Sequence, residues 1–353
     1  MSAREPVIDA HEPVVDVHAH VLLPALRGLV QASDPDGFAA AADLEARRNG
    51  PESLAASGVM IRERFAKLTD LPTRLAAMDD AGIDIQVVSP SPSHYYPWAD
   101  ASLADRIARA ASLATAELVA AAPARLLGLG LVPLQHPALL VPALEYAVLE
   151  LGLAGVEISS SAGDVELSDE RLEPFWARAE ELEAVVFLHP FGCTLDERLD
   201  RFYLANTVGQ PTENAVALSH LIFSGVLDRH PGLRVVAAHG GGYLPGYLGR
   251  SDHAWRVRPE AHGCIEPPSS YLRRLWFDSL VHDAAGLRTL VGAAGADRVV
   301  LGSDFPFDMG VEDPIALVRE AGLGEVAERA ILSGSIRSLI PALSPALDRA
   351  VSP

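Results

Sequence analysis

The sequence predicts an α/β protein built as a (β/α)8 TIM barrel with an insertion after the first strand. Eight short runs rich in β-branched residues recur along the chain, and stretches rich in alanine and leucine with helical periodicity separate most of them. The runs are apolar at nearly every position, which is typical of parallel strands buried on both faces. An open, doubly wound sheet is the alternative, but eight successive units favour the barrel.

The predicted strands, in chain order, are 14–17, 83–88, 126–132, 155–158, 185–188, 234–238, 275–278 and 298–301. Helical periodicity is clearest at 101–122 and 137–151. Residues 22–72 are too long for an ordinary connection and predict an insertion over the barrel mouth. The segments 191–215 and 255–271 are further long excursions, and we expect the tail 341–353 to be loosely held. One elaborated domain over residues 1–353 is the simplest organisation.

Composition excludes several classes of function. The chain has 353 residues, of which 28 are basic and 47 acidic, and the net charge of −19 argues against nucleic acid or an anionic membrane as partner. No apolar run approaches the roughly 18 residues of a membrane span, and residues 1–13 lack the pattern of a signal peptide. We therefore expect a cytoplasmic protein. Cys193 and Cys264 lack the spacing of a structural zinc site.

Several predicted strands end in side chains that can bind a metal ion or transfer a proton. His18 and His20 follow the first strand, His189 the fifth, His239 the sixth and Asp304 the eighth. In an extended segment, residues two positions apart point to the same face, so the first two histidines can contact one ion. Because all strands of a barrel open their carboxyl ends on one face, we expect the five side chains to share a centre.

Imidazole nitrogens with one carboxylate suit zinc or a neighbouring first-row ion. The predicted ligands of one divalent ion, zinc or alternatively manganese, are His18, His20, His189 and Asp304. We assign His239 and Asp304 as catalytic, with His239 left unligated as an acid/base group. A second ion bridged by a carbamylated lysine would need a lysine after the fourth strand, where the chain has Glu157; its only lysine is Lys67. A mononuclear site is therefore expected.

These motifs resemble the amidohydrolase superfamily, in its decarboxylase-rich branch, and most of all the aminocarboxymuconate-semialdehyde decarboxylase type. The resemblance covers most of residues 14–340 and is carried by the His-Ala-His at 18–20, the His-Gly-Gly-Gly at 239–242, the Gly-Ser-Asp-Phe-Pro-Phe at 302–307, and the segments 221–225 and 239–255. It implies the same ligands and the same acid/base histidine. The aromatic-acid decarboxylases of this branch begin with Glu-x-His, so His18 favours the muconate-semialdehyde type.

The resemblance also implies substrate-binding residues and a homodimer. Arg62 and Arg250 match the two arginines that hold substrate carboxylates, and Arg250 of one chain would reach the other chain's site near Arg62. An ion pair between Arg250 and Asp252, within one chain, is the alternative role. Phe191 stands where the family type has tryptophan. Phe305 and Phe307 would pack against a planar substrate or, alternatively, in the core.

The sequence therefore predicts a metal-dependent, non-oxidative decarboxylase of an unsaturated or aromatic-derived carboxylic acid. The alternative is a hydrolase or hydratase of the same superfamily, acting on a lactone, an amide, an activated double bond or a C–C bond. A non-catalytic metal-binding barrel would leave His239 without a role.

Overall fold

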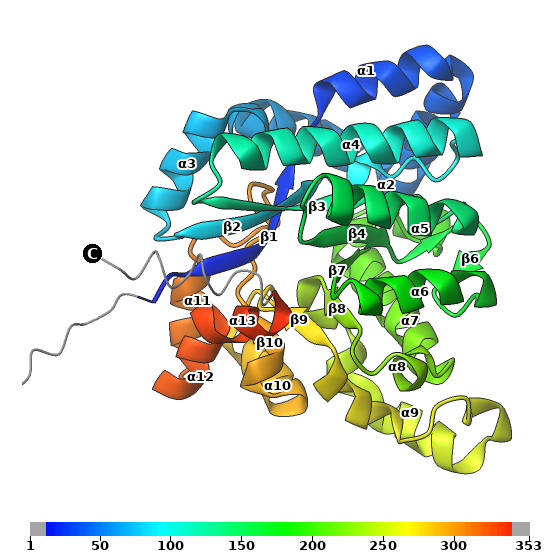
Figure 1. The fold of residues 1–353 in the computed structure, drawn as a ribbon, viewed down its shortest axis with the longest axis vertical. Coiled ribbons are helices and arrows are strands. Elements are labelled where there is room, and N and C mark those ends of the chain that lie inside the picture. Colours follow the sequence, from blue (N-terminus) through cyan, green and yellow to red (C-terminus); the bar gives the residue numbers. More distant parts are fainter. Residues whose placement is uncertain (1–11, 341–353) are drawn as a thin grey trace, which may run out of the picture.

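The computed structural model of the chain describes residues 12–340 and shows eight parallel strands surrounded by helices (Figure 1). The strands, in their order around the sheet, are β1 Val15–Val21, β2 Ile85–Pro90, β3 Leu126–Leu131, β4 Gly155–Ser159, β7 Val185–His189, β8 Arg234–Ala237, β9 Trp276–Asp278 and β10 Val299–Val300. A small antiparallel hairpin, β5 Ser161–Ala162 and β6 Val165–Glu166, follows β4. All eight predicted strands are confirmed, and β1 extends beyond its predicted end.

The sheet closes into a barrel between its first strand and the segment that follows its last. The backbone N–H of Val17 donates to the carbonyl oxygen of Leu301 at 2.8 Å, and that of His20 donates to the carbonyl oxygen of Phe305 at 2.7 Å. These bonds exclude the open, doubly wound sheet. Apolar side chains fill the inside of the barrel, among them Val15, Val17, Ile85, Val87, Leu129 and Phe187, and a larger core lies between the strands and the helices.

The helices form the outer layer, as expected for βα units. They are α1 Pro24–Ser33, α2 Pro35–Thr69, α3 Leu71–Asp80, α4 Ala101–Ala121, α5 Pro137–Glu145, α6 Glu173–Glu181, α7 Gln210–Phe223, α8 Val226–Arg229, α9 Leu244–Val257, α10 Ala284–Ala294, α11 Pro314–Glu320, α12 Glu325–Arg329 and α13 Ser335–Leu339. The helix predicted at 101–122 is α4. The one predicted at 137–151 is α5 followed by a π-helical turn at Tyr146–Glu150.

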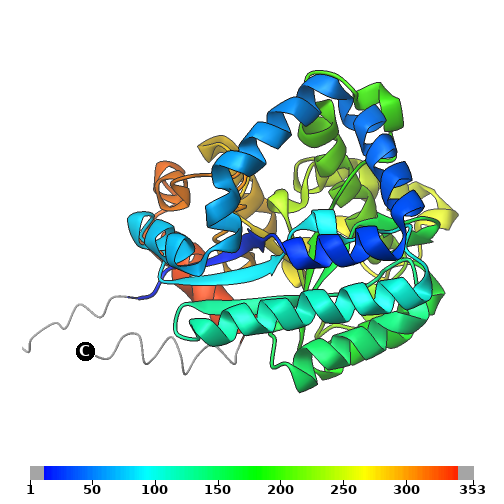
Figure 2. The same cartoon turned by 90° about the horizontal axis from the view of Figure 1, so that it is seen from above.

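The segment 22–72, predicted as an insertion, folds into α1 and the long helix α2, which bend around one side of the molecule (Figure 2). The chain kinks inside α2 at Gly50, whose φ is +76° and which precedes Pro51. A side chain at Gly50 would lie 2.0 Å from the carbonyl oxygen of Asp200, so glycine permits α2 to pass close to the loop after β7. Arg64 also donates to the carbonyl oxygen of Pro306 at 2.9 Å. The insertion therefore reaches the loops at the carboxyl ends of the strands.

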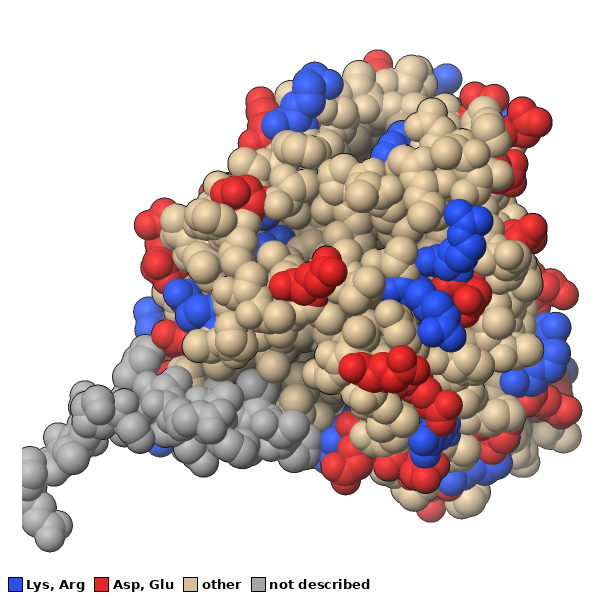
Figure 3. All heavy atoms as spheres, turned by 45° about the horizontal axis from the view of Figure 1, so that its top comes forward, with Lys and Arg blue, Asp and Glu red and all other residues tan. Residues whose placement is uncertain are grey.

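The distribution of surface charge and the lengths of the apolar helices bear on the partners that composition argued against, nucleic acid and membranes. On the face drawn in Figure 3, basic side chains are interspersed with acidic ones and form no continuous basic patch. Across residues 12–340 no helix is long and apolar enough to cross a membrane. The expected loose tail, 341–353, lies outside the described residues.

Candidate metal centre and active site

A bulge in β1 turns the first predicted ligand into the barrel. The pairing of β1 with β2 shifts register between Asp16 and Ala19, and such a shift re-aims the side chains around it. As a result Val17 belongs to the apolar cluster inside the barrel, and the next residue, His18, also faces inward and packs edge-on against Phe187. The buried Asp16 carboxylate fixes this bulge because Oδ1 accepts from the backbone N–H of His18 at 3.1 Å.

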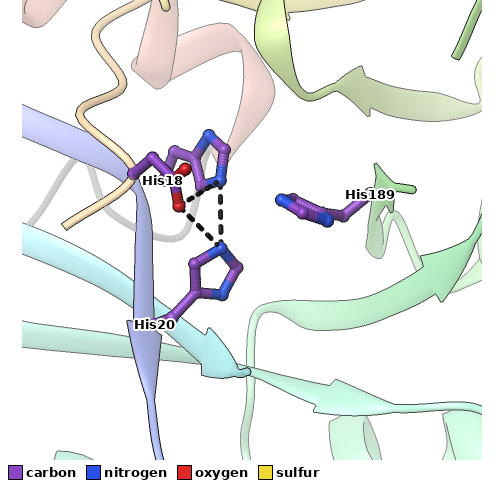
Figure 4. Close-up of side chains that lie close together, drawn as sticks. His18, His20 and His189 are labelled. Carbon is purple, nitrogen blue, oxygen red and sulfur yellow. Dashed lines mark hydrogen bonds and ion pairs between the residues drawn. The ribbon is translucent and has the colours of Figure 1, made fainter. Parts of the chain in front are cut away.

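The structure brings together the four side chains predicted as ligands (Figure 4). His18, His20, His189 and Asp304 are all buried, and each offers one ligand atom within 4.8 Å of the others. The Nε2 atoms of His18 and His20 lie 3.0 Å apart, and Oδ1 of Asp304 lies 3.4 Å from the first and 3.3 Å from the second. The four groups come from the ends of three different strands, as the barrel topology requires.

The hydrogen bonds of the three imidazoles turn the Nε2 atoms toward one centre. Nδ1 of His18 lies 2.6 Å from the Asp278 carboxylate, Nδ1 of His189 lies 2.8 Å from the carbonyl oxygen of Pro190, and Nδ1 of His20 lies 3.1 Å from the Ser89 hydroxyl. An Nδ1 that donates its proton outward leaves a lone pair on Nε2.

Lone pairs that face one another repel unless a cation lies between them. Consistent with this, Nε2 of His189 and Oδ1 of Asp304 are buried without a hydrogen-bond partner among the described residues. Three nitrogen donors and one carboxylate at this spacing fit a divalent transition-metal ion.

The same packing shifts the pKa values of the site. Burial opposes charge on His18, yet the carboxylates of Asp304 and Asp278 outweigh it and raise the pKa of His18 to about 9. The same negative charge favours a metal ion at Nε2, which would take the place of that proton. Burial, reinforced by the neighbouring imidazoles, lowers the pKa of His189 well below its ordinary value. Burial favours the neutral acid of Asp304, but His18 and His20 hold its pKa below the ordinary value. The site therefore keeps an ionised carboxylate next to neutral His189.

His239 lies beside this centre rather than within the group of four. Its Nε2 is 4.0 Å from Oδ2 of Asp304, and its ring centroid is 4.8 Å from that of His189. Its φ of +54° is unusual for a residue with a side chain. Burial and the adjacent His18 lower the pKa of His239 to about 4. His239 is thus a neutral imidazole at the edge of the metal centre, close enough to exchange a proton with a molecule held there.

Asp278, at the end of β9, connects the metal centre to His239. One carboxylate oxygen, Oδ2, accepts from Nδ1 of His18 and from the backbone N–H of His239 at 2.9 Å. The other, Oδ1, accepts from the N–H of Gly240 at 2.7 Å and of Leu280 at 3.2 Å. The sequence did not predict that Asp278 bonds both His18 and His239, because a polar residue at the end of a strand indicates only a side chain that faces the pocket.

Glu157 occupies the position on β4 that a carbamylated lysine would need in order to bridge a second metal ion. Its buried carboxylate accepts a hydrogen bond from the hydroxyl of Tyr95, which also lies 3.1 Å from the carbonyl oxygen of His189. Burial raises the pKa of Glu157. Within the described residues the group of four is the only cluster of His, Cys, Asp and Glu with metal-binding spacing.

The structure does not gather the predicted substrate-binding residues at one site. Arg62 on α2 and Arg250 on α9 are both exposed, and Asp252 bonds Ser269 instead of Arg250. Phe191 is 42% exposed and packs edge-on against Tyr95 next to the centre.

Phe305 was expected to pack either on a planar substrate or in the core, and its position in the structure agrees with the core. Phe305 pairs with Ala19 across the barrel closure, and Ala19 packs in the core between strands and helices. Paired residues share a face of the sheet, so Phe305 also points outward, where its ring lies 5.0 Å from the guanidinium carbon of Arg74. The aromatic residue that faces the centre is Phe307, whose ring centroid is 5.5 Å from that of His20.

Comparison with known proteins identifies the family. The model of the amidohydrolase family matches residues 15–339. The chain belongs to the amidohydrolase family. It is 34% identical over 281 residues to the 2-amino-3-carboxymuconate-6-semialdehyde decarboxylase of Dictyostelium discoideum, an alignment that covers 79% of this chain and 78% of that protein.

Solved structures of two decarboxylases share this barrel. The 5-carboxyvanillate decarboxylase from Sphingomonas paucimobilis superposes with a TM-score of 0.79 at 25% identity, covering 94% of this chain and 99% of that one. A dihydroxybenzoic acid decarboxylase from Polaromonas sp. JS666, solved with bound manganese and the inhibitor 2-nitroresorcinol, has a TM-score of 0.76 at 23% identity, covering 94% and 97%. This amidohydrolase therefore shares its fold with decarboxylases.

Proposed function

We propose that this amidohydrolase is a metal-dependent, non-oxidative decarboxylase of an unsaturated or aromatic-derived carboxylic acid. The observation that carries the proposal is the buried group of three imidazole Nε2 atoms and one carboxylate beside an unligated histidine. The relationship to a decarboxylase at 34% identity supports this reaction over hydrolysis.

His18, His20, His189 and Asp304 would hold one divalent ion, zinc or manganese. Manganese is bound in the related dihydroxybenzoic acid decarboxylase, and the donor set of this chain suits either metal. When bound, the ion would supply a Lewis acid for the negative charge that stays on the substrate when its carboxylate group leaves as CO2.

His239 is placed to hold a proton at Nε2 for the carbon atom that loses CO2. Its backbone is fixed by Asp278, and its side chain is 17% exposed at the rim of the centre. The rings of Phe307 and Phe191 lie next to the metal centre, where they would pack on a planar substrate and exclude water. An acid/base group in this position contributes on the order of 10²–10⁴-fold to the rate.

The substrate carboxylates need local positive charge, because the protein carries a net charge of −19. Arg62 and Arg250 are the proposed anchors, and a guanidinium binds a carboxylate through two parallel hydrogen bonds. Arg250 extends from α9, where Tyr243 and Tyr247 are 50% and 70% exposed. We include in the proposal a homodimer that buries these tyrosines and delivers Arg250 to the partner's site.

Release of CO2 tests the proposal directly. The zinc-loaded and manganese-loaded protein is incubated without O2 with a panel of muconate semialdehydes and hydroxybenzoates, and with a parallel panel of lactones and amides. We expect CO2 from one class of carboxylic acid and none with the Asp304→Ala variant. Turnover of a lactone or amide without any CO2 release would contradict the decarboxylase assignment.

A further inference from the structure

Asn214, on α7, is a fully buried polar side chain next to His239 that the mechanism above does not use. Its Nδ2 lies 2.8 Å from the carbonyl oxygen of Ala238 and 3.4 Å from Nδ1 of His239. Its Oδ1 is buried without a partner in the part of the chain that the structure describes. The amide therefore makes its contacts through its nitrogen.

The contact with Ala238 decides which way this amide faces. A backbone carbonyl oxygen can only accept a hydrogen bond, so the Asn214 atom at 2.8 Å has to be the NH2 group. Half a turn of the amide would place two carbonyl oxygens against each other and lose that bond. The second N–H of the same nitrogen is the one available to Nδ1 of His239.

This orientation selects a tautomer of His239. An Nδ1 that faces an N–H donor is stabilised without a proton, and a neutral imidazole then carries its proton on Nε2. We propose that Asn214 is a positioning residue that holds His239 as the Nε2–H tautomer, so that the reaction centre faces a proton donor. The inference rests on the proposed role of His239 and deepens it.

The tautomer bears on the type of reaction. A histidine that acts as general base toward water, as hydrolysis requires, must present an unprotonated nitrogen to the substrate. In the Nε2–H tautomer the free lone pair lies on Nδ1, which is turned toward Asn214 and away from Asp304. The contact therefore favours donation of the Nε2 proton to a substrate over abstraction of a proton from water. Donation leaves an imidazolate, which the N–H of Asn214 stabilises at Nδ1 and which regains its proton from solvent water before the next turnover.

The tautomer can be measured without any substrate. In the full-length, zinc-loaded protein labelled with ¹⁵N in its histidine rings, NMR distinguishes protonated from unprotonated ring nitrogens, and loss of signals in His239→Gln assigns this residue. We expect an unprotonated Nδ1 and a protonated Nε2. A proton on Nδ1 in the unmutated protein would overturn the inference whatever reaction the enzyme catalyses.

Two variants separate a positioning role from a merely structural one. Asn214→Asp offers Nδ1 an acceptor in place of a donor, so we expect the proton to move to Nδ1 and kcat to fall on the order of 10²–10⁴-fold, with KM and zinc content unchanged. Asn214→Leu removes the donor without adding an acceptor, so the signals should report a mixture of both tautomers. The matched control is Asn49→Asp, because Asn49 lies on α2 and donates to the carbonyl oxygen of Glu45 on its own helix. A lowered kcat with the Nε2–H tautomer retained in both Asn214 variants would reduce Asn214 to a packing role.

Discussion

Asp278→Asn tests whether one buried carboxylate holds both the metal ligand His18 and the backbone of His239. Each carboxylate oxygen of Asp278 accepts from two N–H donors, so in either orientation the NH2 group of asparagine faces two donors and bonds neither. At about 1–3 kcal/mol for each buried donor left unsatisfied, the two lost acceptors lower the free energy of unfolding by about 2–6 kcal/mol. This is a large part of the total stability of a protein.

The substitution also acts on metal binding. In both orientations of the asparagine, Nδ1 of His18 loses its charged partner at 2.6 Å, and loss of such a partner costs on the order of 10–100-fold in metal affinity. We would measure zinc affinity by competition with a chelator, and stability by denaturant unfolding of the metal-free protein. The two readouts separate the effect on the ligand from the effect on the fold.

The control for this experiment is Asp283→Asn. Asp283 is exposed and caps α10 by accepting from the N–H of Gly286 at 2.6 Å, and asparagine caps a helix about as well as aspartate. We expect both readouts to match those of the unmutated protein. If Asp278→Asn binds zinc within about twofold of the unmutated protein, a change far below the range for such partners, then Asp278 does not orient His18 and the reasoning fails.

Four further outcomes are expected. Asp304→Ala should lose the metal ion and the activity together, as metal analysis and CO2 release would show, because it removes the anionic ligand; retention of the ion would contradict this. Metal analysis of the unmutated protein should give one ion per chain at full activity, and two ions would refute the mononuclear site. His239→Ala should keep the ion and lose on the order of 10²–10⁴-fold in kcat, whereas equal loss of the ion would make His239 a ligand. Mixing Arg250→Ala chains with His239→Ala chains should restore activity by forming one intact site; heterodimers that form and stay inactive would place Arg250 in its own chain's site.

The regular part of the fold could be predicted from the sequence because buried parallel strands are apolar at consecutive positions. The predicted end of β1 at Val17 shows where this signal stops. His18 and His20 are polar, so hydropathy ends the strand there, yet pairing with β2 continues as far as Val21 and Pro90. Partner strands, which no local pattern reveals, therefore set the true end of β1.

The ligand group could be predicted because strand ends of a barrel share one face, whereas the surrounding contacts could not. For Phe305 the sequence left two roles open, packing on a substrate or packing in the core. The pairing with Ala19, which packs in the core between strands and helices, decides for the core, and no local pattern reveals that pairing. Asn214 is a polar residue within a helix and follows no strand, so no sequence signal placed it next to His239.

The active site is built from departures from regular strand geometry, and two buried carboxylates stabilise these departures. His239 and Asp304 have φ values of +54° and +58°, which cost on the order of 1–3 kcal/mol each for residues with side chains. Asp278 binds the backbone N–H of His239, while Asp16 binds the N–H groups of His18 and of Ser303, the neighbour of Asp304. The hydrogen bonds to each carboxyl group thus hold the backbone at or next to the strained residues, so that the functional side chains point at the centre. The intrinsic backbone preferences of His239 and Asp304 disfavour these conformations. Hydrogen bonds to residues distant in the sequence, from Ser303 to Asp16 and from His239 to Asp278, therefore specify where the metal ligands and His239 point.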